Sequence, residues 1–259
     1  MRVDIITKIK YYLSINKCLT ADEIKIKLNE ENIKVSKNTI INILNENNFK
    51  YKNPINKPLI TDKQKENRIL WCNKYLNYNW DNVKFTDETS IWIGFKGKRW
   101  VNIEENDYEF KVKHPTKVHI WGYISKTFGR KIYMFTDILT ADGYLNILKN
   151  ELGNEQNFIL QDDNDPKHRA KIITKWKNEN NIKYIDWPSN SPDLNPIENI
   201  WSLLKNKVKK ITAKNINELK ENINKCWIEL EEEHIINTIN SMSKRIKSIL
   251  DNNGKSINY

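Results

Sequence analysis

The order of the apolar segments between residues 83 and 187 restricts the fold more than any other feature of the sequence. Short β-type runs come first, and from residue 144 helical and β-type segments alternate. Consecutive strands followed by alternation describe a mixed sheet with helices on its faces. We therefore predict an α/β domain over residues 81–259. The predicted strands are Val83–Ile93, Lys98–Val101, Lys117–Ser125, Arg130–Leu139, Phe158–Gln161 and Lys183–Trp187, and the predicted helices are Tyr144–Leu152, Arg169–Asn178, one from near Pro196, and the region 215–252.

Residues 1–50 are typical of three short helices instead. Apolar residues recur at helical spacing from Asp4 to about Ile15, and Thr20 with Glu23 makes a capping box at the start of a second helix. A tight turn then precedes a third helix, over Lys37 to about Asn47. This order predicts a helix-turn-helix domain, whose last helix enters the DNA major groove; the alternative is a helical bundle with a solvated polar face. The candidate DNA contacts are Ser36, Lys37, Asn38 and Asn42.

The charge balance favours a polyanionic partner. The chain has 43 Lys and Arg residues against 33 Asp and Glu, a formal net charge of +10, which suits nucleic acid or an acidic membrane surface. No apolar run approaches the ~18 residues of a membrane span, and the N-terminus lacks the pattern of a secretory signal. The 3 cysteines are far apart, which fits a reducing compartment. Composition thus indicates a soluble, intracellular, nucleic-acid-associated protein.

Three acidic residues stand where a metal site can form. Asp87 lies inside an apolar strand, Asp163 directly follows one, and Glu198 lies in the first turn of a helix. A carboxylate beside an apolar strand is costly unless its charge is offset, and a bound metal offsets it. Two Mg²⁺ ions about 3.5–4 Å apart would stabilise both the attacking and the leaving oxygen in phosphodiester cleavage. Spacing does not rank these residues above nearby competitors, which are Glu88, Asp162, Asp165 and Asp193.

His168 and a cluster of lysines each have two possible roles, whereas the tryptophans have one. His168 is a candidate for a phosphate contact, or for capping or packing. A lysine cluster follows Glu198 on the same helix and would either track DNA phosphates or form a solvated face; Lys205 and Lys209 are its candidate DNA contacts. We expect the tryptophans of the predicted sheet region to be core residues, namely Trp92, Trp100, Trp121, Trp187 and Trp201.

Six sequence blocks, taken in order, resemble the transposases of the Tc/mariner superfamily. They are KFTDETSIWIG, KRWV, HPTKVHIWGYIS, FILQDDNDPKH, WPSNSPDLNPIENIWSLLK and SMSKRI. The resemblance runs from about Thr20 to the C-terminus and implies that Asp87, Asp163 and Glu198 are the catalytic metal ligands. The family has 34 residues between the last two, as this chain does. Asp162 is a departure, because the family usually has a non-acidic residue there, and we expect it to affect metal affinity.

The resemblance also implies a fold and an activity. The fold would be ribonuclease-H-like, a mixed five-stranded sheet with flanking helices. The activity would be cut-and-paste transposition, with metal-dependent cleavage at terminal inverted repeats and strand transfer into TA target sites. Its cofactor would be Mg²⁺, two ions, with Mn²⁺ as a substitute. Its partners would be double-stranded DNA and a second copy of the chain in a homodimer, with no membrane, and its place would be the nucleus.

The N-terminal region departs from the family plan. Members usually carry two helix-turn-helix units joined by a basic segment, whereas residues 1–50 correspond to the second unit only. Residues 51–80 would be a linker and a helix capped by Thr61, and residues 81–259 the catalytic domain with its C-terminal helices. We therefore expect an N-terminally shortened protein with a competent metal site and weakened recognition of DNA ends. The alternatives are a DNA-binding remnant that acts as a repressor and a host nuclease with the same fold.

Overall fold

The computed structural model describes residues 2–51, 59–94, 116–153 and 155–258. These belong to two compact units, Met1–Asn56 and Lys57–Tyr259. Each unit has a hydrophobic core of its own. Within the described ranges, no helix is long and apolar enough to cross a membrane. The predicted strand Lys98–Val101, with Trp100, lies outside the described residues.

The first unit consists of the helices α1 (Arg2–Ile15), α2 (Ala21–Glu30) and α3 (Lys37–Glu46). The capping box at the start of α2 is present, since the Thr20 side chain accepts from the amide of Glu23 and the Glu23 carboxylate accepts from the amide of Thr20. The predicted helix-turn-helix arrangement is confirmed. Its core is formed by one apolar face of each helix, with the fully buried residues Ile9, Ile24, Leu28 and Ile40.

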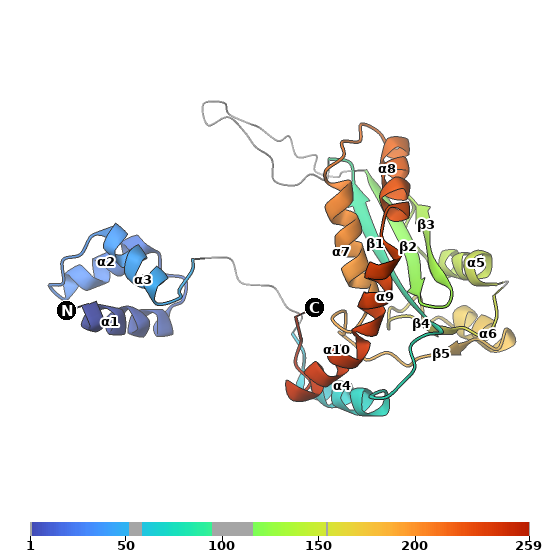
Figure 1. The fold of residues 1–259 in the computed structure, drawn as a ribbon, viewed down its shortest axis with the longest axis horizontal. Coiled ribbons are helices and arrows are strands. Elements are labelled where there is room, and N and C mark those ends of the chain that lie inside the picture. The colour runs from blue at the N-terminus through green and yellow to red at the C-terminus, as the bar shows by residue number, and fades with distance from the viewer. Residues whose placement is uncertain (1, 52–58, 95–115, 154, 259) are drawn as a thin grey trace. The chain divides into compact units, whose positions relative to one another are not determined.

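The second unit is built on a mixed sheet of five strands in the order β3-β2-β1-β4-β5. The strands β1 and β2 pair antiparallel, as do β2 and β3, whereas β4 runs parallel to both β1 and β5. The predicted ribonuclease-H-like sheet is therefore confirmed. Figure 1 shows β1 in the middle of the sheet. The strand bounds are β1 Val83–Trp92, β2 Lys117–Ser125, β3 Gly129–Phe135, β4 Ile159–Gln161 and β5 Lys183–Tyr184.

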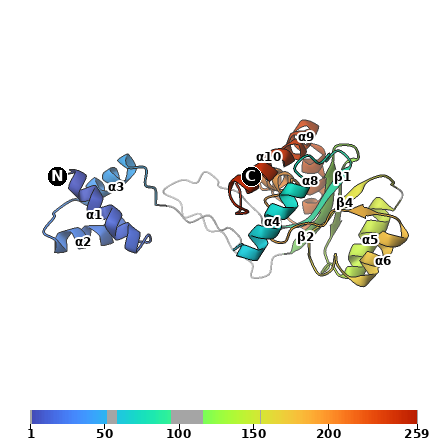
Figure 2. The ribbon, with the colours of Figure 1, turned by 90° about the horizontal axis from the view of Figure 1, so that it is seen from below.

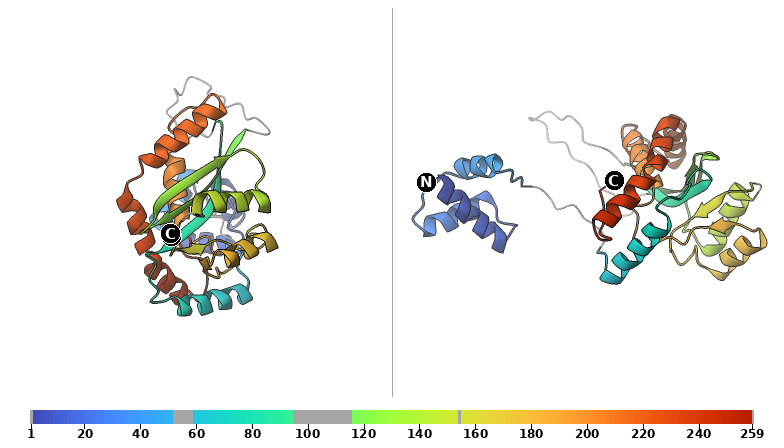
Figure 3. Two further views of the ribbon diagram at one scale, coloured as in Figure 1. Left: turned by 90° about the vertical axis from the view of Figure 1, so that its right-hand side faces the viewer. Right: turned by 60° about the horizontal axis from the view of Figure 1, so that its bottom comes forward.

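Helices cover both faces of this sheet, as Figures 2 and 3 show. The side chains of β2 alternate between two cores: Trp121 and Tyr123 pack toward α5 and α6, while Ile120 and Ile124 pack toward the C-terminal helices. The helices of the first face are α5 (Ala141–Leu152) and α6 (Lys171–Glu179). The helices of the larger core are α4 (Asp62–Lys74), α7 (Ile197–Val208), α8 (Ile216–Ile228), α9 (Glu232–Asn240) and α10 (Met242–Asp251).

One predicted core tryptophan is not a core residue. Trp92 is the last residue of β1 and is 39% exposed, so that prediction was wrong. At a strand end, a side chain loses the neighbours that cover its face of the sheet. Trp121, Trp187 and Trp201 are buried as expected, with at most 4% exposure.

Candidate active site

The strand register places Asp87 and Asp163 side by side. In the parallel pair of β1 and β4, Phe85 lies opposite Gln161. Asp87 lies two residues after Phe85, and Asp163 lies two residues after Gln161. Because side chains two residues apart point to the same face of a strand, both carboxylates reach the same region beside the end of β4. The order of strands predicted from the sequence therefore brings the two aspartates together.

The helix α7 adds Glu198 to this region. It begins at Ile197, directly after Pro196, and packs against β1. Glu198 lies in its first turn, and Trp201 follows one turn later on the same side of the helix. Trp201 Nε1 donates to Asp87 Oδ2 at 3.2 Å, and the Glu198 carboxylate is near enough for its charge to act on Asp87. Asp87, Asp163 and Glu198 all line one pocket of about 480 Å³.

Asp87 and Glu198 form a like-charged pair. Burial, together with the negative charge of Glu198, raises the pKa of Asp87 well above its usual range. Burial also raises the pKa of Glu198. A cation bound in the pocket would offset both negative charges and so relieve their repulsion. Among the described residues, neither Asp87 nor Glu198 belongs to an ion pair with a basic side chain.

The four competing acids are different, because the protein itself offsets their charges. Each has a basic side chain within ion-pair distance, and such acids need no metal. The contrast favours Asp87 and Glu198 as ligands, which the sequence alone did not rank. Asp163 pairs with His168 at 2.7 Å, and it joins the set because it lines the same pocket. The pairs and their N–O distances are Asp162 with Lys177 at 2.6 Å, Asp165 with Lys167 at 2.6 Å, Glu88 with His168 at 2.9 Å, and Asp193 with Arg68 at 2.8 Å.

The donor chemistry of the pocket fits a hard divalent cation. Its acidic lining residues offer only carboxylate oxygens, the ligands that Mg²⁺ and Mn²⁺ prefer. Within the described parts of the chain, no three Asp, Glu, His or Cys side chains converge closely enough to hold a single ion as a group. Asp87, Asp163 and Glu198 line the same pocket, and the charge of Glu198 acts on Asp87. The residue types fit a metal site, and closure of the three around an ion requires side-chain movement.

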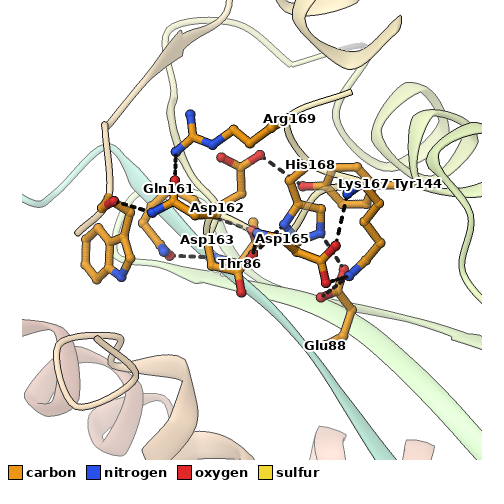
Figure 4. Close-up of polar contacts among 12 residues, drawn as sticks. Thr86, Glu88, Tyr144, Gln161, Asp162, Asp163, Asp165, Lys167, His168 and Arg169 are labelled. Carbon is orange, nitrogen blue, oxygen red and sulfur yellow. Dashed lines mark hydrogen bonds and ion pairs between the residues drawn. The ribbon is translucent and has the colours of Figure 1, made fainter. Parts of the chain in front are cut away.

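The surroundings of Asp163 are visible in Figure 4. Its Oδ1 atom accepts from Nδ1 of His168 at 2.7 Å and from the amide of Asp165 at 2.9 Å. Burial by itself raises the pKa of Asp163, but these hydrogen bonds outweigh burial and the net pKa is lowered. Burial likewise opposes the charged form of His168, yet the hydrogen bonds to Asp163 and Glu88 raise its pKa to about 9. Of the interpretations given for His168, packing fits, since the residue is 3% exposed.

Asp162 does not face the pocket. Its side chain is fully buried on the other side, where Oδ2 accepts from Lys177 Nζ at 2.6 Å and from the Tyr144 hydroxyl at 3.3 Å. The expected effect of Asp162 on metal affinity therefore cannot come from direct ligation. Any such effect would pass through Tyr144, whose ring lies 4.2 Å from the ring of His168.

The pocket wall before α7 is anchored by two buried arginines. Arg68 of α4 is fully buried and binds both carboxylate oxygens of Asp193, at 2.9 and 2.8 Å. Asp193 Oδ2 also accepts from the amide of Ile257 at 2.9 Å. Arg245 of α10 donates to the Asp193 carbonyl at 2.8 Å and to Asn199 Oδ1 at 2.6 Å. The segment that precedes Glu198 is thus joined to α4, α10 and the C-terminal segment.

Gly122 determines how closely Trp201 approaches the sheet. It lies opposite Asp87 in the register of β1 and β2. A Cβ atom there would lie 2.7 Å from the Lys131 carbonyl oxygen and 2.9 Å from Cη2 of Trp201. Because backbone and a packed indole cannot yield easily, Gly122→Ala should lower the free energy of unfolding by about 1–3 kcal/mol. It should also slow catalysis, since Trp201 donates to Asp87.

Urea denaturation and cleavage kinetics would measure both effects. The matched control is Gly143→Ala in α5, where the added Cβ has no neighbour closer than 3.4 Å. We expect that control to keep the stability and the cleavage rate of the wild type. A Gly122→Ala protein as stable as the control would show that the Trp201 contact does not depend on this glycine.

The candidate DNA contacts lie on two different units. On α3, Ser36, Lys37, Asn38 and Asn42 are all exposed. Ser36 is the N-cap of α3 and Lys37 pairs with Asp22 at 2.5 Å. Lys205 of α7 and Lys209, the C-cap residue of that helix, are half-buried, and the charge of Lys205 acts against the rise in the pKa of Glu198. These residues stay predicted DNA contacts.

Two family models match the chain, one over the N-terminal region and one over the catalytic region. A family model described as "Transposase" matches residues 8–77, and one described as "DDE superfamily endonuclease" matches residues 78–220. The Tcb2 transposase of Caenorhabditis briggsae is 30% identical over 223 residues, which are 80% of this chain and 82% of the relative. The Tc1 transposase of Caenorhabditis elegans is 28% identical over 258 residues, 93% of this chain and 94% of the relative.

Solved structures show the same fold. The Mos1 transposase paired-end complex with left transposon end matches with a TM-score of 0.77 at 16% identity, over 100% of this chain and 80% of that one. The catalytic domain of Mos1 mariner transposase matches 79% of this chain with a TM-score of 0.61. The expected N-terminal shortening stays a prediction, because the chain matches 94% of Tc1 but 78% of the Tc3 transposase of Caenorhabditis elegans. The two family matches and the curated relatives together show that the chain belongs to the Tc/mariner transposases of the DDE superfamily.

Proposed function

We propose that the chain cleaves DNA at the inverted-repeat ends of its element and joins these ends to a TA target, with divalent metal bound by Asp87, Asp163 and Glu198. The observation that carries this proposal is the contrast among the acids of the site. The four competitors each have a basic partner, whereas Asp87 and Glu198, within the described residues, form no ion pair with a basic side chain and repel each other. The pocket that they line is open to solvent at Asp163, whose side chain is 51% exposed.

The residues of the pocket have separate tasks in this proposal. Asp87 stands on the central strand, where Trp201 donates to its Oδ2 and limits its rotation. Glu198 stands at the start of α7, opposite Asp87. Two bound Mg²⁺ ions, with Mn²⁺ as a substitute, would activate the attacking water or 3′-hydroxyl and neutralise the charge on the leaving oxygen. The exposed lining residues Ser189 and Asn190 would present polar groups to a DNA strand in the pocket.

The DNA partner and the assembly belong to the same proposal. The helix-turn-helix unit would bind double-stranded DNA, and the net charge of +10 would favour that binding. Mos1 transposase, which shares the fold, forms a paired-end complex with the left end of its transposon. By analogy we propose that two copies of this chain pair two ends as a homodimer. Because its substrate would be genomic DNA, we propose the nucleus as its place of action.

Metal removal tests the proposed chemistry. With a pre-nicked inverted-repeat substrate, the purified chain should cleave in Mg²⁺ or Mn²⁺, stop in EDTA, and resume when Mn²⁺ is restored, because the carboxylates alone cannot stabilise the leaving oxygen. Cleavage and joining would be measured on labelled DNA. Binding without cleavage under all conditions would support the repressor alternative, and cleavage without joining would support a nuclease.

The helix-turn-helix part is tested by Lys37→Ala combined with Asn38→Ala. Among the described residues, Lys37 pairs only with the exposed Asp22, and such a pair contributes little to stability. The double variant should fold normally, bind duplex DNA more weakly, and lose about 1 from the slope of log affinity against log salt. Fluorescence anisotropy across a salt series would measure this slope. The control is Lys10→Ala on α1, an exposed lysine outside α3; equal effects of the two variants would mean that α3 is not the recognition helix.

A further inference from the structure

The carboxylate of Asp163 is anchored through one oxygen only. In the described part of the chain, its hydrogen bonds come from His168 Nδ1 at 2.7 Å and from the Asp165 amide at 2.9 Å, and both go to Oδ1. Asp163 is the most exposed of the three pocket acids and stands on a loop, so its side chain would otherwise rotate freely. Fixing Oδ1 leaves Oδ2 as the oxygen that can turn toward the pocket.

The imidazole of His168 is itself held on all sides. Nε2 donates to Glu88 Oε1 at 2.9 Å, because an ionised carboxylate can only accept. The His168 amide donates to the Asp165 carbonyl at 2.9 Å. The ring lies 4.2 Å from the ring of Tyr144, and the residue is 3% exposed. Figure 4 shows His168 between Asp163 and Glu88, with Tyr144 beside it.

The two neighbours of His168, Tyr144 and Glu88, are themselves held by other side chains. The Tyr144 hydroxyl donates to Asp162 Oδ2 at 3.3 Å, and Lys177 Nζ donates to the same oxygen at 2.6 Å. Tyr144 and Asp162 are fully buried, and Lys177 is 3% exposed. On the other side, Glu88 Oε2 lies 3.6 Å from Lys167 Nζ. A series of contacts therefore runs from α6 through Tyr144 to His168, and ends on the candidate metal ligand.

We propose that His168 is a positioning residue, oriented by Glu88 and Tyr144, that presents Oδ2 of Asp163 to a divalent cation. The inference rests on the proposed function, since it concerns the same metal site. In metal sites, residues that hydrogen-bond to a ligand fix its orientation, and their loss typically costs about 10–100-fold in metal affinity. A carboxylate often orients a metal-ligating histidine through a hydrogen bond; here a histidine orients a carboxylate ligand in the same way. In this arrangement Asp162 acts as the distant support of Tyr144.

Two substitutions of His168 separate positioning from packing. In His168→Asn, the amide nitrogen takes the place of Nδ1 and can still donate to Asp163. In His168→Gln, the amide nitrogen takes the place of Nε2, so the contact with Glu88 is kept and the one with Asp163 is lost. Both variants lose the same ring contact with Tyr144. The measurement is Mn²⁺ binding to the DNA-free protein, followed by the electron paramagnetic resonance of free Mn²⁺, together with thermal melting.

We expect His168→Gln to bind Mn²⁺ about tenfold more weakly than the wild type or worse, and His168→Asn to lose much less affinity. The two variants should melt at similar temperatures. Equal affinity in both variants, whether kept or lost, would overturn the inference. Should neither variant fold, Glu88→Ala at the partly exposed end of the series gives the same test: weaker Mn²⁺ binding is expected, and wild-type affinity would overturn the inference. A wild-type chain that binds no Mn²⁺ would instead overturn the proposed function.

Discussion

Asp163→Asn is expected to reduce DNA cleavage by about a thousandfold or more while the protein stays folded. A metal ion that stabilises the developing charge contributes several kcal/mol, and each 1.36 kcal/mol is a factor of ten in rate. Asparagine keeps the shape of the side chain and can still accept from the Asp165 amide, but it lacks the negative charge that binds a cation. Because Asp163 is 51% exposed, its neutralisation should cost little stability. Single-turnover cleavage of a pre-nicked end in Mn²⁺ would measure the rate, and circular dichroism the fold.

Asp186→Asn is the matched control for this change. Asp186 is also acidic and close to the site, but its side chain is 85% exposed, it does not line the pocket, and Arg169 lies 3.6 Å from it. We expect wild-type cleavage from this variant. An Asp163→Asn protein that cleaves at the control's rate would remove Asp163 from the catalytic set.

Arg68→Met should give the largest loss of stability among single substitutions outside the apolar core. It leaves the Asp193 carboxylate partly buried, with 11% exposure, and without its cation. Breaking a buried pair by removing one partner typically costs about 3–5 kcal/mol. The loss should also reach the active site, since Asp193 belongs to the segment that leads into Glu198. Equilibrium unfolding in urea would give the change in free energy.

Lys65→Ala provides the comparison on the same helix. Lys65 pairs with Asp62 at 2.7 Å, but the Asp62 side chain is 93% exposed, so we expect a change within about 1 kcal/mol. If Arg68→Met destabilised the protein no more than Lys65→Ala, the Arg68–Asp193 pair would not be an anchor of the site.

Local patterns in the sequence predicted most of the fold, because the interactions behind them are local. The capping box at Thr20–Glu23 and the segment order from β1 to α6 follow from spacing and side-chain type alone. The site was predictable in part for the same reason: strand order determines that Asp87 and Asp163 meet. The choice of Asp163 over Asp162 came from the family resemblance, and the structure explains it by the alternation of side chains at the end of β4.

Contacts between distant residues account for what the sequence did not reveal. Arg68 and Asp193 are 125 positions apart, and His168 and Glu88 are 80 apart. No spacing rule relates such residues, so Asp193 and Glu88 stood as competing ligands rather than as partners of basic side chains. The sequence also did not predict the role of Gly122, because that role depends on the close approach of Trp201, which belongs to α7. The position of Arg68 was an available signal, because Trp71 and Cys72 follow it by three and four residues in the same helix and so lie on its face.

Binding of a metal ion by Asp87, Asp163 and Glu198 can be measured directly, by cleavage of the polypeptide with iron bound in the site. Fe²⁺ in place of Mg²⁺, with ascorbate and peroxide, produces hydroxyl radicals that cut the backbone near the ion, and the assay needs no knowledge of the DNA ends. Metal binding by the three carboxylates predicts cuts close to Asp87, Asp163 and Glu198, suppressed by excess Mg²⁺ and lost in Asp87→Asn. Cuts elsewhere, or an unchanged pattern in Asp87→Asn, would contradict it.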